Sequence, residues 1–492
     1  MFAVYGSAIK NLDAIAFRKY LIPPELLMEN AAVAAANAMI FKWSFSSCAL
    51  VCGDGNNSGD GFALARHLSN RGIDATVILL GNRSRFSKIT LLNYRILKKM
   101  GIKIVDNPSA AKFKKLIRES DVIADAVYGT GFRGVLEEKM RPYFKAINNS
   151  SKRVISLDVP SGLNCDTGES DRDCITADIT VTFGAVKAGL LWNSAVGKSK
   201  ELLIADISLP KEIILKEKNF IIAEKEILSL LAAHEKKAKE GWIHKSQRGR
   251  ASFIGGNRGM EGSIQLASEA ALKTGAGIVY TYMLSPAKKK FFPEIVFSLT
   301  LKEAMKQSKV WIAGCGMGTG DDALEALDCI NKNRADSIVL YDADALNLIS
   351  RMNEKKKKRF LKNSVITPHP KEFLRLSGKR FLNIKEKISC AEEFSRDYKS
   401  VVVLKSPPTI VTDSKTTIIF PNMSKKLATA GSGDVLSGII GGLLARGFSP
   451  MTASSLGVFI HFYAGFYSAS ENPTASEFLK NISKPIKEVL NA

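Results

Sequence analysis

The sequence lacks an apolar run long enough to cross a bilayer. The longest apolar stretches, Val435–Leu444 and Gly457–Ala469, are interrupted by Gly, His or Tyr, whereas a spanning helix takes about 20 apolar residues. The first residues also lack the charged and then apolar segments of a secretory signal. We therefore expect a soluble, cytoplasmic protein with no membrane partner.

Paired cysteine spacing is absent as well. The seven cysteines are odd in number, form no repeating framework and lack nearby histidines at the spacing of a zinc site. This argues against a disulfide scaffold and a cysteine-ligated zinc centre. Reduced thiols in a cytosolic protein are the simplest interpretation.

Acidic residues are comparatively few. The chain has 70 Lys and Arg against 48 Asp and Glu, a formal net charge of +22. The basic blocks Lys288–Lys290 and Lys355–Arg359 are scattered and lack the interleaved aromatics of a nucleic-acid surface. We expect a solvated basic surface that attracts phosphorylated small molecules and binds no nucleic acid. A nucleotide- or RNA-binding scaffold stays open as the non-enzymatic alternative.

Short Val- and Ile-rich runs alternate with helical patterns along two stretches of the chain. Such alternation predicts the α/β class, with parallel strands covered by helices on both faces. Residues 211–241 are charged and hold no glycine before Gly241, which places a boundary near residues 215–225. We predict two domains, residues 1–222 and 223–492.

Three polar, glycine-rich loops follow predicted strands in the first domain. They read GDGNNSGDGFALAR from Gly53, ADAVYGTGFRG from Ala124 and SLDVPSGLNCDTG from Ser156. The carboxyl ends of parallel strands share one sheet edge, so oxygens of Asn57, Asp125 and Ser161 could surround a hard cation. Asp125 could alternatively serve as general acid or base, or only brace its loop.

These loops, together with LMENAA from Leu27, resemble the YjeF N-terminal family of NAD(P)H-hydrate epimerases over about residues 5–215. The resemblance implies a Rossmann-like three-layer α/β/α domain that interconverts the R and S epimers of NADH or NADPH hydrated at C6. It implies K⁺ on Asn57, Asp125 and Ser161, substrate contact by Asp158, and Asp125 as the leading acid/base candidate. The implied phosphate cradle comprises Asn56, Asn57, Ser58, Gly59 and Asp60, and Gly129, Thr130, Gly131, Phe132, Arg133, Gly134 and Val135.

The second domain contains LATAGSGDVLSGIIGGLLARG from Leu427. Amides at the start of a helix can bind a phosphate, and Asp434 beside them could take a proton from a substrate hydroxyl. The alternative is that Ser432 or Asp434 merely caps the helix. Similarly, Asp342 and Asp344 could be active-site carboxylates or acidic residues at a helix start.

The GSGD sequence resembles the ribokinase-like superfamily. With HKSQRGRASFIGG, LKTGAG, YDADALNLI and ITPHPKE, it resembles the ADP- or ATP-dependent NAD(P)H-hydrate dehydratases over about residues 225–490. The resemblance implies that Asp434 activates the C6 hydroxyl of the S hydrate for phosphorylation by ADP, or by ATP, before phosphate is eliminated. It implies an anion hole at Gly431, Ser432 and Gly433, with Mg²⁺ bridging the phosphates. The implied ligand contacts are Ser263, Gly318 and His369 for the hydrate, and Lys405, Ser406, Pro407, Pro408, Thr409 and Gly433 for the nucleotide.

Three positions depart from these families. Ser58 and Ser406 replace glycines, and Met260 replaces an aromatic residue. A ribokinase-like small-molecule kinase with an accessory first domain is the alternative enzyme; it would release a stable phosphorylated product. We expect a homo-oligomer that acts on hydrated NADH and NADPH and on ADP.

Overall fold

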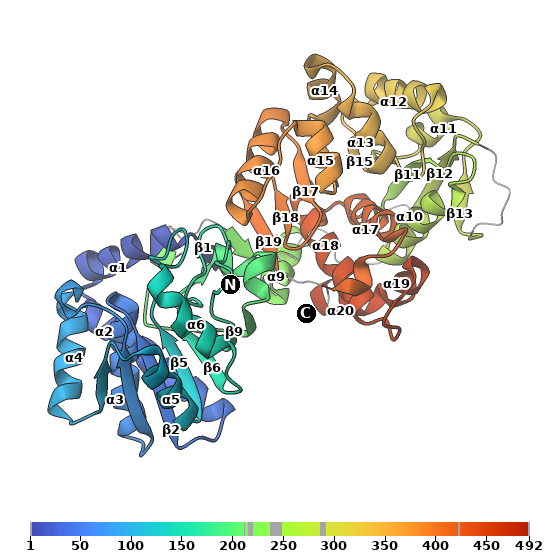
Figure 1. The fold of residues 1–492 in the computed structure, drawn as a ribbon. Coiled ribbons are helices and arrows are strands. Elements are labelled where there is room, and N and C mark those ends of the chain that lie inside the picture. The colour runs from blue at the N-terminus through green and yellow to red at the C-terminus, as the bar shows by residue number, and fades with distance from the viewer. Residues whose placement is uncertain are drawn as a thin grey trace. The chain divides into compact units, whose positions relative to one another are not determined.

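A computed structural model describes residues 2–210, 212–214, 220–236, 248–285, 292–421 and 424–490 (Figure 1). The chain divides into two compact units. The first unit comprises Phe2–Phe220 with Asn383–Glu386, and the second comprises Ile221–Leu382 and Lys387–Ala492, with Met1 grouped there. The basic block Lys288–Lys290 lies outside the described residues, as does most of the charged stretch around the predicted boundary.

The first unit alternates strands and helices from its start. Its elements are β1 Phe2–Val4, α1 Gly6–Tyr20, α2 Pro24–Lys42, β2 Ser47–Cys52, α3 Asn56–Ser69, β3 Asp74–Leu79, α4 Lys88–Lys99, β4 Ile104–Asp106, α5 Ala110–Glu119, β5 Val122–Ala126, α6 Arg141–Asn148, β6 Arg153–Leu157, β7 Ala177–Phe183, β8 Val186–Lys187, α7 Asn193–Val196 and β9 Ser199–Ala205. Helix α2 has Pro24 in its first turn, where the missing N–H of proline costs no intrahelical hydrogen bond. Helix α1 was not predicted.

The main sheet of the first unit is wholly parallel, in the order β4-β3-β2-β5-β6-β7-β9. Side chains of β2 alternate between its faces, as a buried strand requires. Cys48, Leu50 and Cys52 pack with the helices α1 to α4, whereas Ala49 and Val51 pack with α5 and α6. The predicted three-layer α/β/α arrangement is confirmed.

The second unit is also an α/β fold. Its elements are β10 Phe220–Ile222, α9 Lys225–Lys236, β11 Arg250–Gly255, α10 Glu261–Thr274, β12 Ile278–Met283, β13 Ile295–Phe297, α11 Leu301–Lys306, β14 Val310–Ala313, α12 Asp321–Asn333, β15 Ile338–Tyr341, α13 Ala343–Ser350, α14 Glu354–Leu361, β16 Ser364–Ile366, α15 Pro370–Ser377, α16 Ile384–Tyr398, β17 Val401–Leu404, β18 Thr409–Thr412, β19 Thr417–Phe420, α17 Ser432–Ala445, α18 Pro450–Phe466, α19 Ala475–Asn481 and α20 Ser483–Leu490.

The sheet of this unit runs in the order β13-β12-β11-β14-β15-β16-β17-β18-β19-β10. Strands β18 and β19 form an antiparallel hairpin, with Thr412 opposite Thr417. Helix α17 packs between α10 and α18 over the apolar core, and two of its glycines, Gly438 and Gly442, allow close contact with α10. A Cβ at Gly438, for example, would stand 2.1 Å from the carbonyl oxygen of Ala267. This packing fixes the start of α17 at the edge of the sheet.

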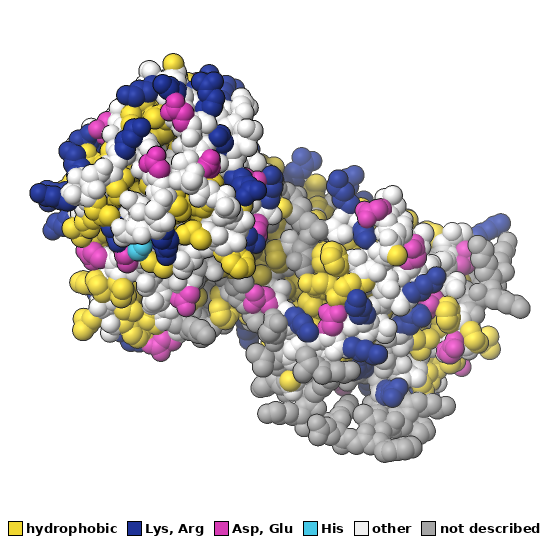
Figure 2. Space-filling view, turned by 90° about the horizontal axis from the view of Figure 1, so that it is seen from below, with side chains coloured by type: hydrophobic (Ala, Val, Ile, Leu, Met, Phe, Trp, Pro, Cys, Tyr) yellow, Lys and Arg dark blue, Asp and Glu magenta, His cyan; other side chains and the backbone are white. Residues whose placement is uncertain are grey.

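Two surface properties follow from the same coordinates. No helix within the described ranges is long and apolar enough to cross a membrane. On the face shown in Figure 2, Lys and Arg side chains are spread among neutral and hydrophobic ones and form no single stripe. The scattered charge expected from the sequence is therefore what this face presents.

Candidate active sites

The three polar loops of the first unit meet at one edge of its sheet. Strand β5 lies between β2 and β6 in parallel register, so the residues after all three strands emerge side by side. Gly129 shows how tightly the loops approach one another. A Cβ at this position would stand 3.3 Å from the Cβ and Cγ atoms of Asn57. The expected convergence of the loops is confirmed.

Asp125 is fully buried at the end of β5, and its carboxylate accepts hydrogen bonds from neutral donors. Oδ2 accepts hydrogen bonds from Ser156 Oγ at 2.8 Å and from the Ser161 amide at 2.9 Å, and Oδ1 accepts one from Ser161 Oγ at 2.5 Å. Burial raises the pKa of Asp125, and the bonds from Ser161 and Ser156 oppose that rise. No basic side chain of the described residues forms an ion pair with this carboxylate.

Asn57 lies beside Asp125 and holds an orphaned acceptor. Its Nδ2 donates to the Tyr128 carbonyl at 3.1 Å, but its buried Oδ1 has no hydrogen-bond partner. Such an atom normally has a partner. An unpartnered amide oxygen, a buried carboxylate and the Ser161 hydroxyl form an oxygen-only set that suits a hard cation and lacks the soft ligands of zinc. No cluster of three or more His, Cys, Asp or Glu that could hold a metal occurs within the described residues.

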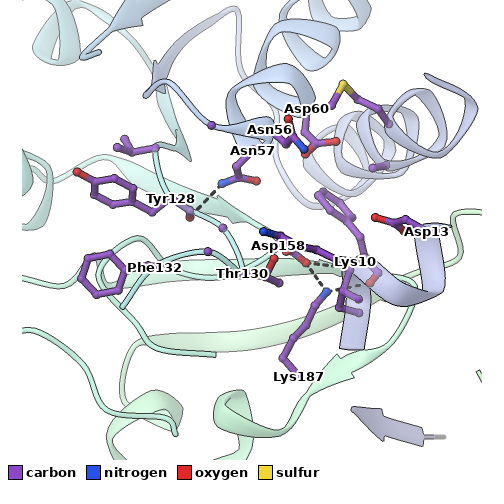
Figure 3. A pocket seen from close by; sticks show the side chains of 18 of the residues that line it. Lys10, Asp13, Asn56, Asn57, Asp60, Tyr128, Thr130, Phe132, Asp158 and Lys187 are labelled. Atoms are coloured by element: carbon purple, nitrogen blue, oxygen red, sulfur yellow. Dashed lines mark hydrogen bonds and ion pairs between the residues drawn. The ribbon is translucent and has the colours of Figure 1, made fainter. Parts of the chain in front are cut away.

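A cavity of about 540 Å³ opens in front of these loops; we call it the first cavity (Figure 3). Many predicted ligand contacts line it, namely Asn56, Asn57, Asp60, Gly129, Thr130, Gly131, Phe132, Arg133, Val135 and Asp158. Three residues of the predicted cradle, Ser58, Gly59 and Gly134, are not among the described residues that line it. Ser58 is buried inside α3, where its hydroxyl donates to the Ala126 carbonyl at 3.2 Å, so the first turn of α3 accommodates this serine.

The first cavity also holds a charged cluster that the sequence did not reveal. Lys187 is buried and forms an ion pair with Asp158 Oδ1; it also donates to Thr182 Oγ1 at 3.0 Å and to the Phe183 carbonyl at 2.9 Å. Asp158 itself has a positive φ of 65°, a strained conformation for a residue with a Cβ. The three bonds of Lys187 use every donor of its ammonium group and fix the direction of Asp158.

Two further carboxylates share this cluster, Asp13 from α1 and Asp60 from α3 (Figure 3). Burial is the main cause that raises the pKa of Asp13 to about 6; Lys187 opposes the rise and Asp158 adds to it. Burial, followed by the charges of Asp158 and Asp13, raises the pKa of Asp60 well above its usual range. The first cavity therefore contains two carboxyl groups, Asp13 and Asp60, whose pKa values are raised mainly by burial.

In the second unit, the site is built around the start of α17. Gly431 takes a positive φ of 84° and is the residue before the helix. No side chain caps this helix: Ser432 Oγ instead lies 3.0 Å from His461 Nε2. The capping alternative is therefore wrong. The Ser432 amide donates to the Thr429 carbonyl at 3.2 Å, and the amides of Gly433 and Asp434, which have no partner within the helix, stay available to an anion.

Asp434 lies in the first turn of α17 beside groups from three other elements. Burial is the first cause that raises its pKa to about 6, and the nearby Asp342 carboxylate raises it further. Hydrogen bonds from Ser263 and Cys315, and the charge of Lys405, act in the opposite direction. Asp434 is thus a carboxylate that can accept a proton near neutral pH.

Asp342 and Lys405 form the second charged part of this site. Lys405 Nζ lies 2.9 Å from Asp342 Oδ1, and Ser437 Oγ donates to Asp342 Oδ2 at 2.7 Å. A Cβ added to Gly433 would lie 3.5 Å from Lys405 Nζ, which places the ammonium at the start of α17. Asp342 does not cap its own helix, α13; its role here is to hold Lys405.

Other predicted contacts have structural partners of their own. The Gly318 amide donates to Asp344 Oδ2 at 2.8 Å. His369 begins α15, where its Nδ1 accepts from the amides of Lys371 and Glu372, while burial lowers its pKa. The other ring nitrogen, Nε2, lies 3.3 Å from Glu372 Oε1, so a ligand on His369 would have to share this nitrogen with Glu372 or displace it.

The loop Lys405–Thr409 is anchored from beneath by Lys387, which the sequence did not single out. Its buried ammonium donates to the Ser406 carbonyl at 2.8 Å, to Ser406 Oγ at 2.9 Å and to the Pro408 carbonyl at 2.7 Å. Ser406 has a φ of 89°, which suits glycine. The bond from Lys387 to its hydroxyl compensates part of that strain.

Comparisons with known proteins cover both units. Residues 24–189 match the family described as YjeF-related protein N-terminus, and residues 251–488 match the family described as NAD(P)H-hydrate dehydratase. The bifunctional NAD(P)H-hydrate repair enzyme of Dictyoglomus turgidum is 32% identical over 527 residues, which cover 99% of this chain and 98% of that protein. The enzyme of the same name from Thermofilum pendens is 33% identical, and the matched region covers 94% of this chain and 91% of that protein. The one from Escherichia coli is 31% identical over 90% of this chain and 84% of its own.

Proposed function

The chain belongs to the family of bifunctional NAD(P)H-hydrate repair enzymes, and from this premise we propose how its two units divide the work. It is an enzyme of nicotinamide cofactor repair, with an isomerase and a lyase activity on one chain. We assign epimerisation of the R and S hydrates of NADH and NADPH to residues 1–222. Dehydration of the S hydrate at the expense of a nucleotide is assigned to residues 223–492.

In the first unit, the dinucleotide lies along the carboxyl edge of the sheet, with its hydrated ring in the first cavity. The start of α3 and the loop after β5 supply amides for the pyrophosphate, as helix starts do. Asp158 binds the hydrated ring. The observation that supports this placement is the charged cluster around Lys187, because epimerisation at C6 needs a proton donor and a proton acceptor within reach.

The chemistry balances with these groups alone. A protonated Asp13 or Asp60 gives its proton to the C6 hydroxyl; the C6–O bond breaks, water leaves, and the N1 lone pair forms a C=N bond. Water then adds to the other face of C6 and returns a proton to a carboxylate of the cluster. Lys187 keeps Asp158 correctly directed throughout by its ion pair. A role of Asp125 as acid or base stays a prediction, since its carboxylate is held by serines and does not line the first cavity.

Asn57, Asp125 and Ser161 would hold K⁺. The fit rests on the orphaned Asn57 Oδ1 and on the buried Asp125 carboxylate, which lacks a basic partner among the described residues. When bound, the ion supplies a fixed positive charge at the sheet edge and neutralises Asp125. The chain's own contribution is to hold the loops after β2, β5 and β6 together around that point.

Replacing K⁺ by choline should therefore lower both the epimerisation rate, by about tenfold, and the melting temperature. Ions that bind only the folded state stabilise it by mass action. In Asn57→Ala, the melting temperature should respond much less to K⁺. A wild-type melting temperature that is the same in both salts at equal ionic strength would count against this site.

In the second unit, Asp434 takes the proton from the C6 hydroxyl of the S hydrate. The hydroxyl oxygen attacks the terminal phosphorus of the nucleotide, while the amides of Gly431 to Gly433 and the Lys405 ammonium stabilise the developing charge. The phosphate then leaves from C6 as the N1 lone pair forms a C=N bond, and loss of a C5 proton restores the dihydropyridine ring. Ser263, Gly318 and His369 contact the hydrate.

The nucleotide lies over Lys405–Thr409, the loop that Lys387 anchors. We favour ADP over ATP as donor, giving AMP and phosphate. Mg²⁺ would supply positive charge that neutralises the nucleotide phosphates. This ion commonly binds through substrate phosphates and few carboxylates, so the residues around Asp434 and Asp342 suffice to receive it. We also expect the enzyme to act in the cytoplasm as a homo-oligomer.

The pH dependence of dehydration follows from Asp434. As a base it acts only when ionised, and its pKa of about 6 means that the rate should fall about tenfold per unit below pH 6 and level off above it. Ser263→Ala removes a hydrogen bond that lowers this pKa, so it should move the acid limb to higher pH. Stopped assays of NADH formation across pH 5–8 measure both curves; an acid limb that stays in place in Ser263→Ala would contradict the assignment.

The test that separates repair from a kinase is the fate of the phosphate. Purified protein is given the S hydrate of NADH with ADP, and phosphorus NMR follows the products. Repair predicts one inorganic phosphate and one AMP for every NADH. A stable phosphate ester on the dinucleotide, with no return of NADH, would instead establish the kinase alternative.

A further inference from the structure

The parallel sheet of the first unit has a switch point between β2 and β5, where the order in which the strands are added reverses. From the central strand β2, the chain winds outward through β3 and β4, then returns to β5 and continues through β6 and β7 the other way. This is the strand order of dinucleotide-binding folds, in which the ligand lies across the carboxyl ends of the strands at the switch. The first cavity lies at β2 and on the β5, β6 and β7 side of this switch.

A second cavity of about 730 Å³ lies at the carboxyl ends of β2, β3 and β4. Asp54, Tyr128 and Glu137 line both cavities, so the two meet at the switch point. A ligand that spans the switch point would therefore place one half in the first cavity and the other half in the second cavity. The proposed function uses only the first.

The loop that follows β3 is basic. It contains Arg83 and Arg85, both of which line the second cavity. In folds with this strand order, the region after the second strand contacts the adenosine ribose: an acidic residue binds a free 2′-hydroxyl, whereas an Arg accommodates a 2′-phosphate. Residues 80–85 read Leu-Gly-Asn-Arg-Ser-Arg and contain no acidic residue.

Both arginines have partners that a phosphate could replace. Arg83 pairs with Asp106 and lies over the Tyr94 ring at 5.2 Å, and its side chain is 44% exposed. Arg85 contacts Asp54 at 3.4 Å and is 72% exposed. Exposed ion pairs contribute little, whereas a guanidinium binds a phosphate through paired, charge-assisted hydrogen bonds.

We propose that the second cavity binds the adenosine half of the hydrated dinucleotide and that Arg83 and Arg85 favour the substrate that carries a 2′-phosphate. This inference rests on the proposed epimerase function and adds its specificity: hydrated NADPH is preferred to hydrated NADH. The single chemical difference between these substrates is the 2′-phosphate, so the preference reports on this one contact.

The test compares epimerisation of the two substrates by wild-type protein and by Arg83→Ala/Arg85→Ala. Purified R hydrates are used without ADP, so that the second unit is idle, and chromatography follows the appearance of the S hydrate. In the variant, KM for hydrated NADPH should rise about tenfold or more, as expected for lost charge-assisted hydrogen bonds. Its kcat, and KM for hydrated NADH, should stay nearly unchanged.

The control is Lys112→Ala/Lys115→Ala on α5, which removes the same number of positive charges from exposed positions that line neither cavity. It should leave both KM values as in the wild type. Equal KM changes for the two substrates in the arginine variant, or no KM change for either, would overturn the proposal. An unchanged kcat with hydrated NADH shows that the arginine variant is folded. A wild-type protein that interconverts neither substrate would instead refute the epimerase function itself.

Discussion

Asp434→Asn should lower the rate of dehydration of the S hydrate by about 10³-fold, a typical loss when a general base is removed. The amide has nearly the shape of the carboxylate but cannot accept the hydroxyl proton. Nucleotide affinity should change little, because the amides at the start of α17 and Lys405 are untouched. Single-turnover assays of NADH formation with the pure S hydrate and saturating ADP measure the effect.

The control for this variant lies within the same chain. Epimerisation by the first unit should proceed at the wild-type rate in Asp434→Asn, which shows that the protein is intact. Ser432→Ala is the matched control, two residues before Asp434 in the same helix. The Ser432 hydroxyl contacts His461 and is not assigned a proton transfer, so the effect of this substitution should be much smaller. Wild-type dehydration by Asp434→Asn would remove Asp434 from the chemistry.

Lys187→Met should lower the epimerisation rate by about 10²-fold. The substitution leaves the buried Asp158 carboxylate without its cation and without the ion pair that fixes its direction. With this positive charge gone, the pKa of Asp13 and of Asp60 should rise further, because Lys187 opposes the rise in both. The measurement is the rate at which the pure R hydrate gives the S hydrate, followed from pH 5 to pH 8.

Loss of a buried ion-pair partner can also destabilise the fold, typically by about 3–5 kcal/mol. The double variant Lys187→Met/Asp158→Asn removes both charges and should regain most of the melting temperature without regaining epimerisation. A purely structural role of Lys187 predicts instead that Lys187→Met alone keeps the wild-type epimerisation rate at temperatures well below its own melting temperature. Dehydration of the S hydrate, which the second unit performs, should continue in both variants.

The parts of the fold that the sequence predicted are those with strong local signals. The strands β2, β5 and β6 are short apolar runs that end in glycine-rich polar loops, and parallel pairing then brings those loops to one edge. The hairpin β18–β19 has an equally local signal, because a polar turn separates two short apolar runs. In each case, residues next to one another in the chain carry the information.

The charged cluster of the first cavity could not be predicted in this way. Asp13 lies on α1, which begins at Gly6 without a side-chain cap from Tyr5, and Lys187 lies on a strand of two residues. Nothing in the sequence around Lys187 distinguishes it from a surface lysine. Only the fold shows that Asp158, Thr182 and Phe183 surround its ammonium group.

The role of Ser432 at the start of α17 also could not be predicted from the sequence. From the sequence, Ser432 could be an ordinary helix cap, because serine before an apolar helix commonly is one. The hydroxyl is instead directed to His461, which lies 29 residues further along the chain. The contact with His461 thus excludes the interpretation of Ser432 as a helix cap. Amides in the first turn of α17 remain free to bind a ligand.

The central claim is that one chain makes both epimers of a damaged cofactor repairable. It is tested most directly by incubating the protein with an equimolar mixture of R and S hydrates of NADH and with ADP, while the absorbance of NADH is recorded. Wild-type protein should return all of the hydrate to NADH, whereas Lys187→Met should convert the S half quickly and the R half only at the spontaneous rate. Return of just the S half by the wild type, or of neither, would contradict the account.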